Sequence, residues 1–277
     1  MKKSRALRPS TIASGALLLI VSVIIFFPFL WMLTSAAKPY SEIYHWPIVW
    51  WPSKFEFANF VNAWNAIPFG RIFLNSIVVT VIGTLVKMIL ACMVAYAFVF
   101  IRFPYRDVIF LFFLGALMVP GNVVIIVNFL TVSSVGWVNT FAGLIVPGMG
   151  SIFGMFLLRQ HMRTIPSSVI EAAQIDGAGH IRTLLRIVLP MSKAPLITVG
   201  LVAAVEEWNS FIWPLIITNT MEMKTLPIGL LALKDSEGYE DWGAIMAGTS
   251  MVVIPILVLF FLTQRHIVSG FTQSALK

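Results

Sequence analysis

Residues 171–190 of the chain read EAAQIDGAGHIRTLLRIVLP, a polar segment that contains two glycines and lies between long apolar runs. Ser168 and Glu171 have the spacing of a capping box, so a short helix is predicted to begin at Ser168. Gly177 and Gly179 are expected to end that helix in a sharp turn, because glycine readily adopts the backbone angles such a turn needs. A polar pair of short helices in an otherwise apolar chain indicates a surface on which another protein docks.

A second short helix is predicted to follow the turn and to end at Pro190. Four apolar residues recur in it with the i, i+3, i+4, i+7 spacing of one helix face. We expect this face to pack against the rest of the chain: Ile181, Leu184, Leu185 and Val188. The side chains of Ala172 and Ala173 on the first helix are small, which would allow a partner to approach closely.

The composition of the chain is that of an integral membrane protein. Of its 277 residues, 58% are hydrophobic and 11% are charged, and the mean hydropathy is +0.90. Soluble domains carry roughly 25% charged residues. The one cysteine, Cys92, excludes a disulfide within the chain, and the four scattered histidines have no spacing typical of a metal site, so none is expected.

Apolar runs predict an all-α, polytopic membrane protein with six transmembrane helices in a single domain, residues 1–277. A polar cytoplasmic loop, residues 163–194, separates the fourth span from the fifth. The first apolar run is too long for a signal peptide and is interpreted as an uncleaved anchor. The predicted spans are residues 12–35, 72–100, 108–130, 141–159, 195–218 and 244–264.

The distribution of basic residues predicts the orientation in the membrane. With a cytoplasmic N-terminus, thirteen of the nineteen lysines and arginines lie inside, five lie outside, and Lys87 lies within a span. Both termini and the 171–190 segment are therefore expected in the cytoplasm, and the net charge of +7 needs no nucleic-acid partner to explain it. The residues expected inside are Lys2, Lys3, Arg5, Arg8, Arg102, Arg106, Arg159, Arg163, Arg182, Arg186, Lys193, Arg265 and Lys277.

The segment 38–71, expected outside, is rich in aromatic residues, and two interpretations stay open. The rings could form a belt at the level of the lipid headgroups. They could instead form a docking surface for an extracytoplasmic partner. Among its aromatic residues are Tyr40, Tyr44, Trp46, Trp50, Trp51, Phe55, Phe57, Phe60 and Trp64.

Three ionisable residues fall near the middle of predicted spans: Lys87 in the second, and Glu206 and Glu207 in the fifth. Each such charge costs at least ~2.5–3.5 kcal/mol on insertion scales, so these residues usually pair or face water. The two spans run in opposite directions, which places the three residues at similar depth. We predict that Lys87 pairs with one glutamate, while the other faces elsewhere, about 100° away around the helix. The pair is either a structural clamp or part of a solute path.

Polar and aromatic residues in the spans are further candidates for the lining of a solute path. An asparagine offers a donor and an acceptor to a hydroxyl or phosphate oxygen, and a tryptophan offers a ring face to a sugar or a cation. The alternative is that the asparagines hydrogen-bond to neighbouring helices. The pathway candidates are Lys87, Asn128, Glu206, Glu207, Trp208, Asn209 and Trp213.

The pattern EAA-x-x-DGA followed by I-x-LP resembles the EAA loop of ABC importer permeases. The matching residues are Glu171, Ala172, Ala173, Asp176, Gly177, Ala178, Ile187, Leu189 and Pro190. In that family the loop forms the coupling helices that sit in a cleft of the ATP-hydrolysing subunit. The resemblance therefore implies that contacts to an ATPase are made by Glu171, Ala172, Ala173, Asp176, Gly177, Ala178 and Gly179.

The resemblance extends over nearly the whole chain and points to the carbohydrate-type permeases, similar to the second permease of the maltose system. It is closest to the sn-glycerol-3-phosphate/glycerophosphodiester importer permeases. The stretches that carry it are LNSIVVT (74–80), AYAF and IRFPYRD (95–107), MVPGNVVIIVNF (118–129), EEWNSFIWPL (206–215) and QRHIVSGF (264–271). It implies a type I ABC importer permease fold in a bacterial inner membrane, with membrane lipid around it.

The resemblance also implies a division of labour among subunits. The chain would pair with a second, homologous permease, two ATPase subunits that bind ATP and Mg²⁺, and an extracytoplasmic solute-binding protein. The chain has no G-x-x-x-x-G-K-[ST] phosphate loop and no G-x-S-x-G or H-E-x-x-H motif, so it is not expected to be an enzyme or to bind a cofactor itself. The expected function is ATP-driven import of a polar, carbohydrate-like solute by alternating access. The alternative, a stand-alone secondary transporter, would leave the 171–190 segment unexplained.

Overall fold

The computed structural model describes residues 9–235 and 241–275, with side chains described for residues 13–234 and 241–264. These residues form helices and connecting turns and contain no β-strand, which confirms the all-α prediction. The side chains of the first basic cluster, Lys2 to Arg8, and of the C-terminal Arg265 and Lys277 lie outside the described residues.

The chain divides into two compact units, and the prediction of a single domain stays a prediction. The first unit, residues 1–67 and 230–253, holds α1 (Pro9–Ala36), α2 (Tyr40–Ile43), α3 (Ala58–Ala66) and parts of α14 (Leu226–Asp235) and α15 (Trp242–Ala275). The second unit, residues 68–229 and 254–277, holds the remaining elements. These are α4 (Phe69–Phe100), α5 (Arg106–Ala116), η1 (Gly121–Val124), α6 (Ile125–Ser134), α7 (Phe141–Ile145), η2 (Val146–Gly148), α8 (Ile152–Met162), α9 (Ser167–Ile175), α10 (His180–Thr183), η3 (Leu184–Val188), α11 (Leu189–Met191), α12 (Lys193–Trp208), α13 (Ile212–Ile217) and η4 (Met221–Met223).

By length and composition, three described helices can each cross a membrane: Ala13–Ala36, Phe69–Phe100 and Trp242–Gln264. Three further pairs of helices pass the same test together but are sharply bent, which brings the total to as many as six spans. The bends measure 88° between Arg106–Ala116 and Gly121–Ser134, 47° between Phe141–Gly148 and Ile152–Met162, and 87° between His180–Met191 and Lys193–Trp208.

Three predicted spans are therefore not single helices. The predicted span 141–159 is divided between α7 with η2 and α8, which are bent by 47°. The predicted span 108–130 breaks before Pro120, where α5 ends and η1 begins. The predicted span 195–218 breaks after Trp208, and Pro214 falls in the first turn of the new helix α13. A proline lacks the backbone N–H that a helix interior needs, and it is tolerated in a first turn, where that group has no partner anyway. Pro28 and Pro255, by contrast, lie inside the continuous helices α1 and α15.

The first unit has several buried polar residues near the end of α1, among them Lys38 and Asn59. The Lys38 side chain is 1% exposed, and its ammonium nitrogen lies 4.0 Å from the centre of the Trp31 ring. Burial lowers the pKa of Lys38 from its usual value, and nearby Glu42 opposes that shift. The Asn59 amide of α3 donates hydrogen bonds to the backbone carbonyls of Ala36 and Lys38, which joins α3 to the end of α1.

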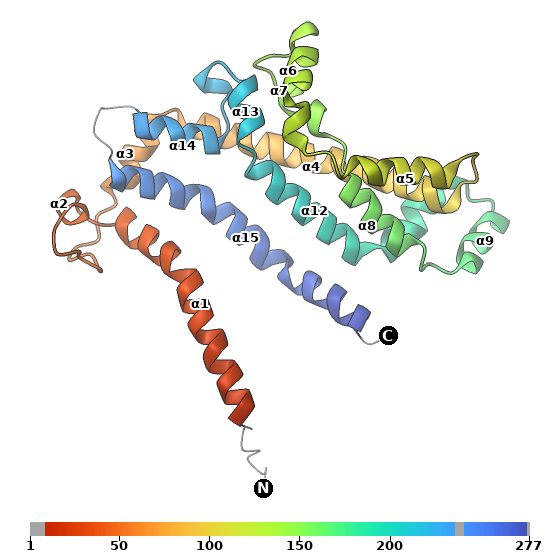
Figure 1. Cartoon of the computed structure of the whole chain (residues 1–277), viewed down its shortest axis with the longest axis horizontal. Coiled ribbons are helices and arrows are strands. Elements are labelled where there is room, and N and C mark those ends of the chain that lie inside the picture. The colour runs from red at the N-terminus through yellow and green to blue at the C-terminus, as the bar shows by residue number, and fades with distance from the viewer. Residues whose placement is uncertain (1–8, 236–240, 276–277) are drawn as a thin grey trace. The chain divides into compact units, whose positions relative to one another are not determined.

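In the second unit, α4 packs against both α8 and α12 (Figure 1). Glycines allow these helices to approach closely. A Cβ atom on Gly154 of α8 would lie 2.8 Å from a Val199 methyl of α12, and one on Gly200 would lie 2.9 Å from the Met88 sulfur of α4. The core between the helices is formed by small and apolar side chains, among them Ala91, Ala95, Met155, Leu158, Met162 and Val199.

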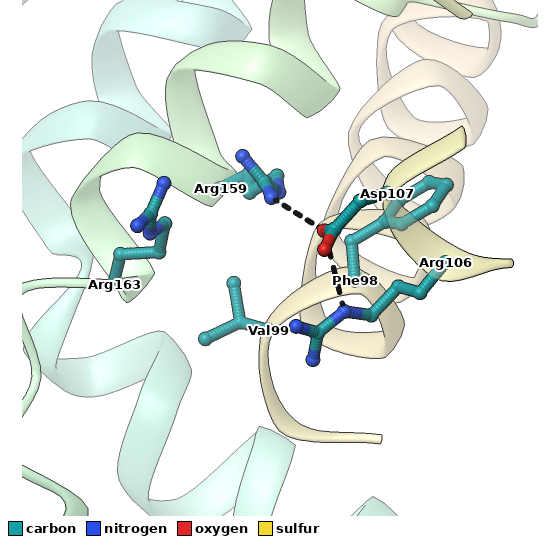
Figure 2. Close-up of a pocket in the computed structure, with 6 residues that line it drawn as sticks. All are labelled: Phe98, Val99, Arg106, Asp107, Arg159 and Arg163. Carbon is teal, nitrogen blue, oxygen red and sulfur yellow. Dashed lines mark ion pairs between the residues drawn. The ribbon is translucent and has the colours of Figure 1, made fainter. Parts of the chain in front are cut away.

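At the C-terminal end of α4, arginines from two other elements gather near one carboxylate (Figure 2). Asp107 of α5 lies 3.6 Å from the Arg106 Nε and 3.8 Å from a terminal guanidinium nitrogen of Arg159 on α8. The Arg159 guanidinium also lies 3.7 Å from the centre of the Phe110 ring. These contacts hold the start of α5 against the end of α8.

Candidate functional site

The polar segment forms the predicted pair of short helices, with a different start. Helix α9 begins at Ser167, and its N-cap is Pro166, which has no side-chain cap. The predicted capping box at Ser168 and Glu171 is therefore wrong, because Ser168 already lies within the helix and cannot take the cap position. Helix α9 ends at Ile175, close to the predicted end at Asp176.

The two glycines have different conformations. Gly177 has φ +74°, in the left-handed region that favours glycine, and it follows the C-cap residue Asp176. The Ala178 N–H donates to the Ala173 carbonyl at 2.9 Å, which closes the turn. Gly179 has φ −70° and ψ 168°, an extended conformation that any residue adopts, and is the N-cap of α10. Gly177 therefore makes the turn, while Gly179 begins the next helix.

The predicted apolar face of the second helix is split in two. Leu184 and Val188 are buried in the core, but the Ile181 side chain is 75% exposed and Leu185 is 56% exposed. Residues Leu184–Val188 form a π-helical turn, η3, so the regular α-helical spacing on which the prediction rests does not hold through this segment. The turn lies just before Pro190, which is consistent with a local widening that accommodates the proline ring. The helix continues through Pro190 to Met191 rather than ending at Pro190.

We use the name coupling knob for residues 167–191, which comprise α9, α10, η3 and α11. Its outer surface carries most of the residues that the resemblance implied for ATPase contact. Ala173 is buried and Ala178 is half-buried, and the exposed members are Glu171, Ala172, Asp176, Gly177 and Gly179. Beside them lies Ile175, whose side chain is 86% exposed.

The base of the coupling knob is attached firmly to the transmembrane helices. Ile170, Leu184 and Val188 are buried in the same core as α4 and α8. The Tyr96 hydroxyl of α4 and the His180 Nδ1 of α10 lie 3.1 Å apart, within hydrogen-bond distance. The coupling knob therefore has a buried inner side and an exposed outer side.

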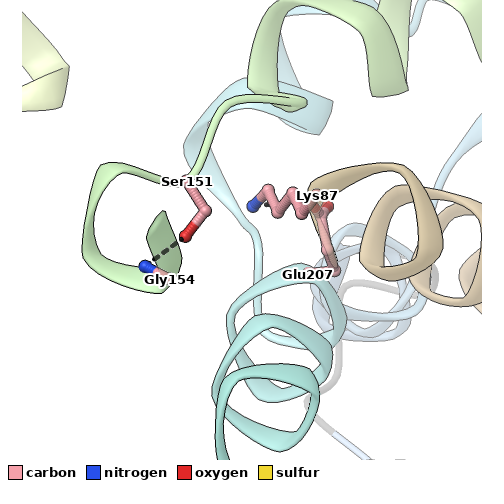
Figure 3. A network of polar contacts seen from close by, with 4 residues as sticks. All are labelled: Lys87, Ser151, Gly154 and Glu207. Atoms are coloured by element: carbon pink, nitrogen blue, oxygen red, sulfur yellow. Dashed lines mark hydrogen bonds and ion pairs between the residues drawn. The ribbon is translucent and has the colours of Figure 1, made fainter. Parts of the chain in front are cut away.

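The predicted ion pair forms between α4 and α12, and Glu207 is the partner. The Lys87 Nζ lies 2.7 Å from Glu207 Oε1, with 12% and 11% of the two side chains exposed. Gly83, one turn before Lys87, leaves the space that Glu207 occupies, because a Cβ atom there would lie 3.0 Å from the Glu207 Cδ. Figure 3 shows the Lys87 side chain extending toward the turn of Ser151 and Gly154, where the Ser151 hydroxyl caps α8.

The other pathway candidates differ in their surroundings. The Glu206 side chain is exposed, as expected for the glutamate that does not pair with Lys87. Asn209 is exposed and donates to the Val205 carbonyl in its own helix at 2.8 Å. The Trp213 indole N–H donates to the Gly143 carbonyl of α7 at 3.0 Å. Trp208 is 6% exposed and packs edge-on against a phenylalanine of α4, and Asn128 lies half-buried on α6.

The structure thus brings together Lys87 and Glu207, while no hydrogen bond or ion pair among the described residues joins Asn128 to them. A cavity of about 140 Å³ lies beside this region, and Thr80 and Trp208 are among its lining residues. Sequence reasoning missed Gly83, although a glycine one helical turn from an intramembrane lysine was a usable signal. It also missed Asn139, whose side-chain oxygen accepts hydrogen bonds from the backbone N–H groups of Asn219 and Thr220.

The sequence of the chain matches a known protein family and is similar to characterised permeases. The sequence profile of the family described as "binding-protein-dependent transport system inner membrane component" matches residues 87–273. The chain is 33% identical to the diacetylchitobiose uptake system permease protein NgcG of Streptomyces coelicolor, over 95% of this chain and 88% of that protein. It is 32% identical to the sn-glycerol-3-phosphate transport system permease protein UgpE of Escherichia coli, over 95% and 96% of the two chains.

Two solved structures have a similar fold. One is a bacterial ABC transporter involved in the import of the acidic polysaccharide alginate, with a TM-score of 0.83, 20% identity, and coverage of 95% of this chain and 99% of the other. The second is an alginate ABC transporter in complex with a pentasaccharide-bound periplasmic protein, with a TM-score of 0.58, 14% identity, and coverage of 92% and 94%. At these identities the likeness shows a shared fold.

Proposed function

The chain belongs to the family of binding-protein-dependent transport system inner membrane components, and we propose how its residues divide the work of such a permease. It forms the solute path with a second, homologous permease. Two separate ATPase subunits bind ATP and Mg²⁺ and grip the coupling knob of each permease. A solute-binding protein docks on the opposite side of the membrane, and both termini of this chain lie in the cytoplasm, as the charge distribution predicts.

The exposed apolar surface of the coupling knob carries this proposal. Ile175, Ile181 and Leu185 have 86%, 75% and 56% of their side chains exposed, next to charged and small residues. An apolar patch rimmed by polar residues is typical of a surface that another protein covers. The alanines and glycine beside the patch allow close approach of a partner's groove.

The buried side of the coupling knob supports its role as a lever. A pull on α9 and α10 acts on α4 and α8 through the shared core at Ile170, Leu184 and Val188. Packed side chains of this kind move together, since a protein interior is as dense as a crystal of small molecules. ATP-driven closure of the two ATPase subunits would therefore tilt α4 and α8, and with them α12, which the Lys87–Glu207 pair joins to α4.

The charged residues near the middle of the spans, Lys87, Glu206 and Glu207, are suited to a solute path that opens and closes. The Lys87–Glu207 pair joins α4 to α12 and keeps both charges compensated in the membrane. Glu206 is exposed beside the pair, so in a membrane its carboxylate would need water or a partner subunit. We assign Glu207 to the clamp between helices and Glu206 to the water-filled side of the path, with Asn128, Trp208, Asn209 and Trp213 as further lining candidates.

The solute is a polar, carbohydrate-like molecule. Among the similar permeases, one belongs to an sn-glycerol-3-phosphate transport system and another to a diacetylchitobiose uptake system. Glycerol-3-phosphate or a glycerophosphodiester is the first candidate, and a neutral sugar is the second. Thermal-shift screening of the cognate solute-binding protein against these compounds distinguishes between them.

The coupling role is tested by purifying the chain after co-expression with its neighbouring permease and ATPase genes. The ATPase should co-elute with the unchanged chain and should be lost with Ile181→Glu, because a charge in the apolar contact would be left without a partner. Ile181→Met, which keeps an apolar side chain of similar size, should retain the ATPase. Unchanged co-elution with Ile181→Glu, in a variant that still inserts and binds the second permease, would contradict the proposed grip.

A further inference from the structure

Four arginines surround the junction of α4, α5 and α8, where one carboxylate faces them. Arg106 and Asp107 begin α5, Arg159 lies in the last turn of α8, and Arg163 follows it. Arg102 comes from the connection between α4 and α5. One aspartate against four guanidinium groups leaves a net charge of three positive units at this junction. Figure 2 shows Arg106, Arg159 and Arg163 around one space.

Two adjoining cavities lie within this cluster. The first has a volume of about 350 Å³ and is lined by Phe98, Val99, Arg106, Asp107, Arg159 and Arg163. The second has a volume of about 450 Å³ and is lined by Arg102, Phe103, Tyr105, Arg106, Asp107 and Val108. Arg106 and Asp107 line both, so the cavities meet at the start of α5. Each has room for a phosphate group with its substituents.

Arg159 is a buried cation whose charge is poorly compensated. Its side chain is 8% exposed, and its contact with Asp107, at 3.8 Å, is longer than a hydrogen bond. The Arg159 Nε is buried and has no hydrogen-bond partner among the described residues. Contact with the Phe110 ring compensates part of the charge, and the C-terminal dipole of α8 favours a cation. Neither explains why three more arginines gather around the same space, whereas an anion would pair with all of them.

The start of α5 provides a second feature suited to an anion. Helix α5 has 11 residues, and its N-cap, Tyr105, has φ 58° and makes no side-chain cap. The first backbone N–H groups of a helix have no partner within it, and together with the helix dipole they attract negative charge. Asp107 in the first turn partly meets this attraction, but its side chain is 75% exposed and points to the cavity shared with the arginines.

We propose that this arginine pocket, formed by Arg102, Arg106, Arg159 and Arg163, binds the phosphate group of an acidic phospholipid headgroup. The residues that follow on α5 are apolar and outward-facing: the Val108, Leu111 and Phe112 side chains are 64%, 65% and 79% exposed. They provide a surface for acyl chains directly beside the cations. Arginine suits phosphate because its planar fork donates two parallel hydrogen bonds. The charge distribution predicts that this end faces the cytoplasm, where anionic lipids attract basic clusters.

The site is tested by native mass spectrometry of the complex released from nanodiscs of phosphatidylcholine with increasing phosphatidylglycerol. The unchanged protein should retain phosphatidylglycerol in preference to phosphatidylcholine. The double variant Arg106→Gln with Arg163→Gln should weaken this retention about tenfold or more, since each arginine near the surface contributes to the attraction. Arg159 is left in place because removing a buried side chain could unfold the chain.

Lys193→Gln is the control, because it removes an exposed basic side chain that lies outside the coupling knob and does not line either cavity. It should change the retention less than twofold. An equal loss in both variants would show general attraction to a charged membrane and would overturn the pocket. Retention that is unchanged in the double variant would overturn it as well.

The phosphate group in the pocket could belong to a lipid headgroup or to a free phosphate ion, and a measurement with inorganic phosphate distinguishes the two. Millimolar phosphate, added to the complex in phosphatidylcholine nanodiscs, should raise the unfolding temperature little. Phosphatidylglycerol should raise the unfolding temperature clearly in the unchanged protein and not in the double variant. Stabilisation by phosphate alone that equals the effect of the lipid, and is lost in the double variant, would overturn the lipid headgroup in favour of a free anion. This test does not depend on solute uptake, so its failure would leave the proposed function intact.

Discussion

At the scale of single residues, the Lys87–Glu207 pair is the clearest case of a side chain whose role depends on its surroundings. Two adjacent glutamates with the same chemistry have different positions: Glu207 pairs with Lys87, and Glu206 is exposed. The space left by Gly83 determines which of them can approach α4. Breaking a buried pair by removing one partner typically costs ~3–5 kcal/mol, because the remaining charge is left uncompensated.

Reversal of the charges tests this pair. Lys87→Glu and Glu207→Lys should each reduce the yield of folded chain several-fold, and the double variant should recover most of it. Lys87→Glu combined with Glu206→Lys is the control and should not recover, since residue 206 lies on another side of α12. Yield is measured by monodisperse elution in detergent. A double variant at 87 and 207 that folds no better than the single changes would rule out a stabilising pair.

At the scale of elements, the coupling knob contains a glycine turn and a π-helical turn. Gly177 supplies the left-handed residue between α9 and α10. Leu184 and Val188 of η3 lie in the core, while Ile181 and Leu185 are exposed. The helix pair thus has apolar residues at its surface and other apolar residues in the core. The i, i+3, i+4, i+7 spacing predicted that all four residues share one buried face, and this prediction is wrong for Ile181 and Leu185.

Replacement of each glycine by alanine separates their roles. Gly177→Ala should destabilise the turn by about 1–2 kcal/mol, the cost of a left-handed conformation for an L-residue. Gly179→Ala should have little effect, because its φ is −70° and no atom lies within 4 Å of the added Cβ. Amide hydrogen exchange over residues 171–183 should accelerate about 5- to 30-fold in the first variant. Equal exchange in the two variants would refute this assignment.

At the scale of the whole molecule, the chain is one permease of a binding-protein-dependent importer, and its fold matches that of an ABC importer permease. The three bent helix pairs all lie in the second unit, where α4 packs against α8 and α12. Irregular backbone at membrane depth is tolerated where it is buried in protein or lines a water-filled cavity. The proposed energy source lies outside the chain, on partner ATPases.

Reconstitution in liposomes tests this dependence. Solute uptake should require this chain, the second permease, the ATPase subunits, ATP and the solute-binding protein together. The chain alone, under a proton or sodium gradient, should show no uptake above that of empty liposomes. Gradient-driven uptake by the chain alone would contradict the proposed mechanism and favour a secondary transporter.

The sequence alone determined the helical membrane class, the approximate positions of the apolar runs, the family, and the pairing of Lys87 with a neighbouring glutamate. These features depend on composition, local spacing and the high cost of an isolated charge in lipid, which act along the chain or between segments of known depth. Only the tertiary structure decided that Glu207 rather than Glu206 is the partner and that Ser168 is not a cap. It also decided that the spans near Pro120, Pro147 and Pro214 are broken, and that Ile181 and Leu185 are exposed. Each of these outcomes depends on which atoms approach from other helices: the space beside Gly83, the core that receives Leu184 and Val188, and the arginines that meet at Asp107. Spacing along one segment does not contain that information.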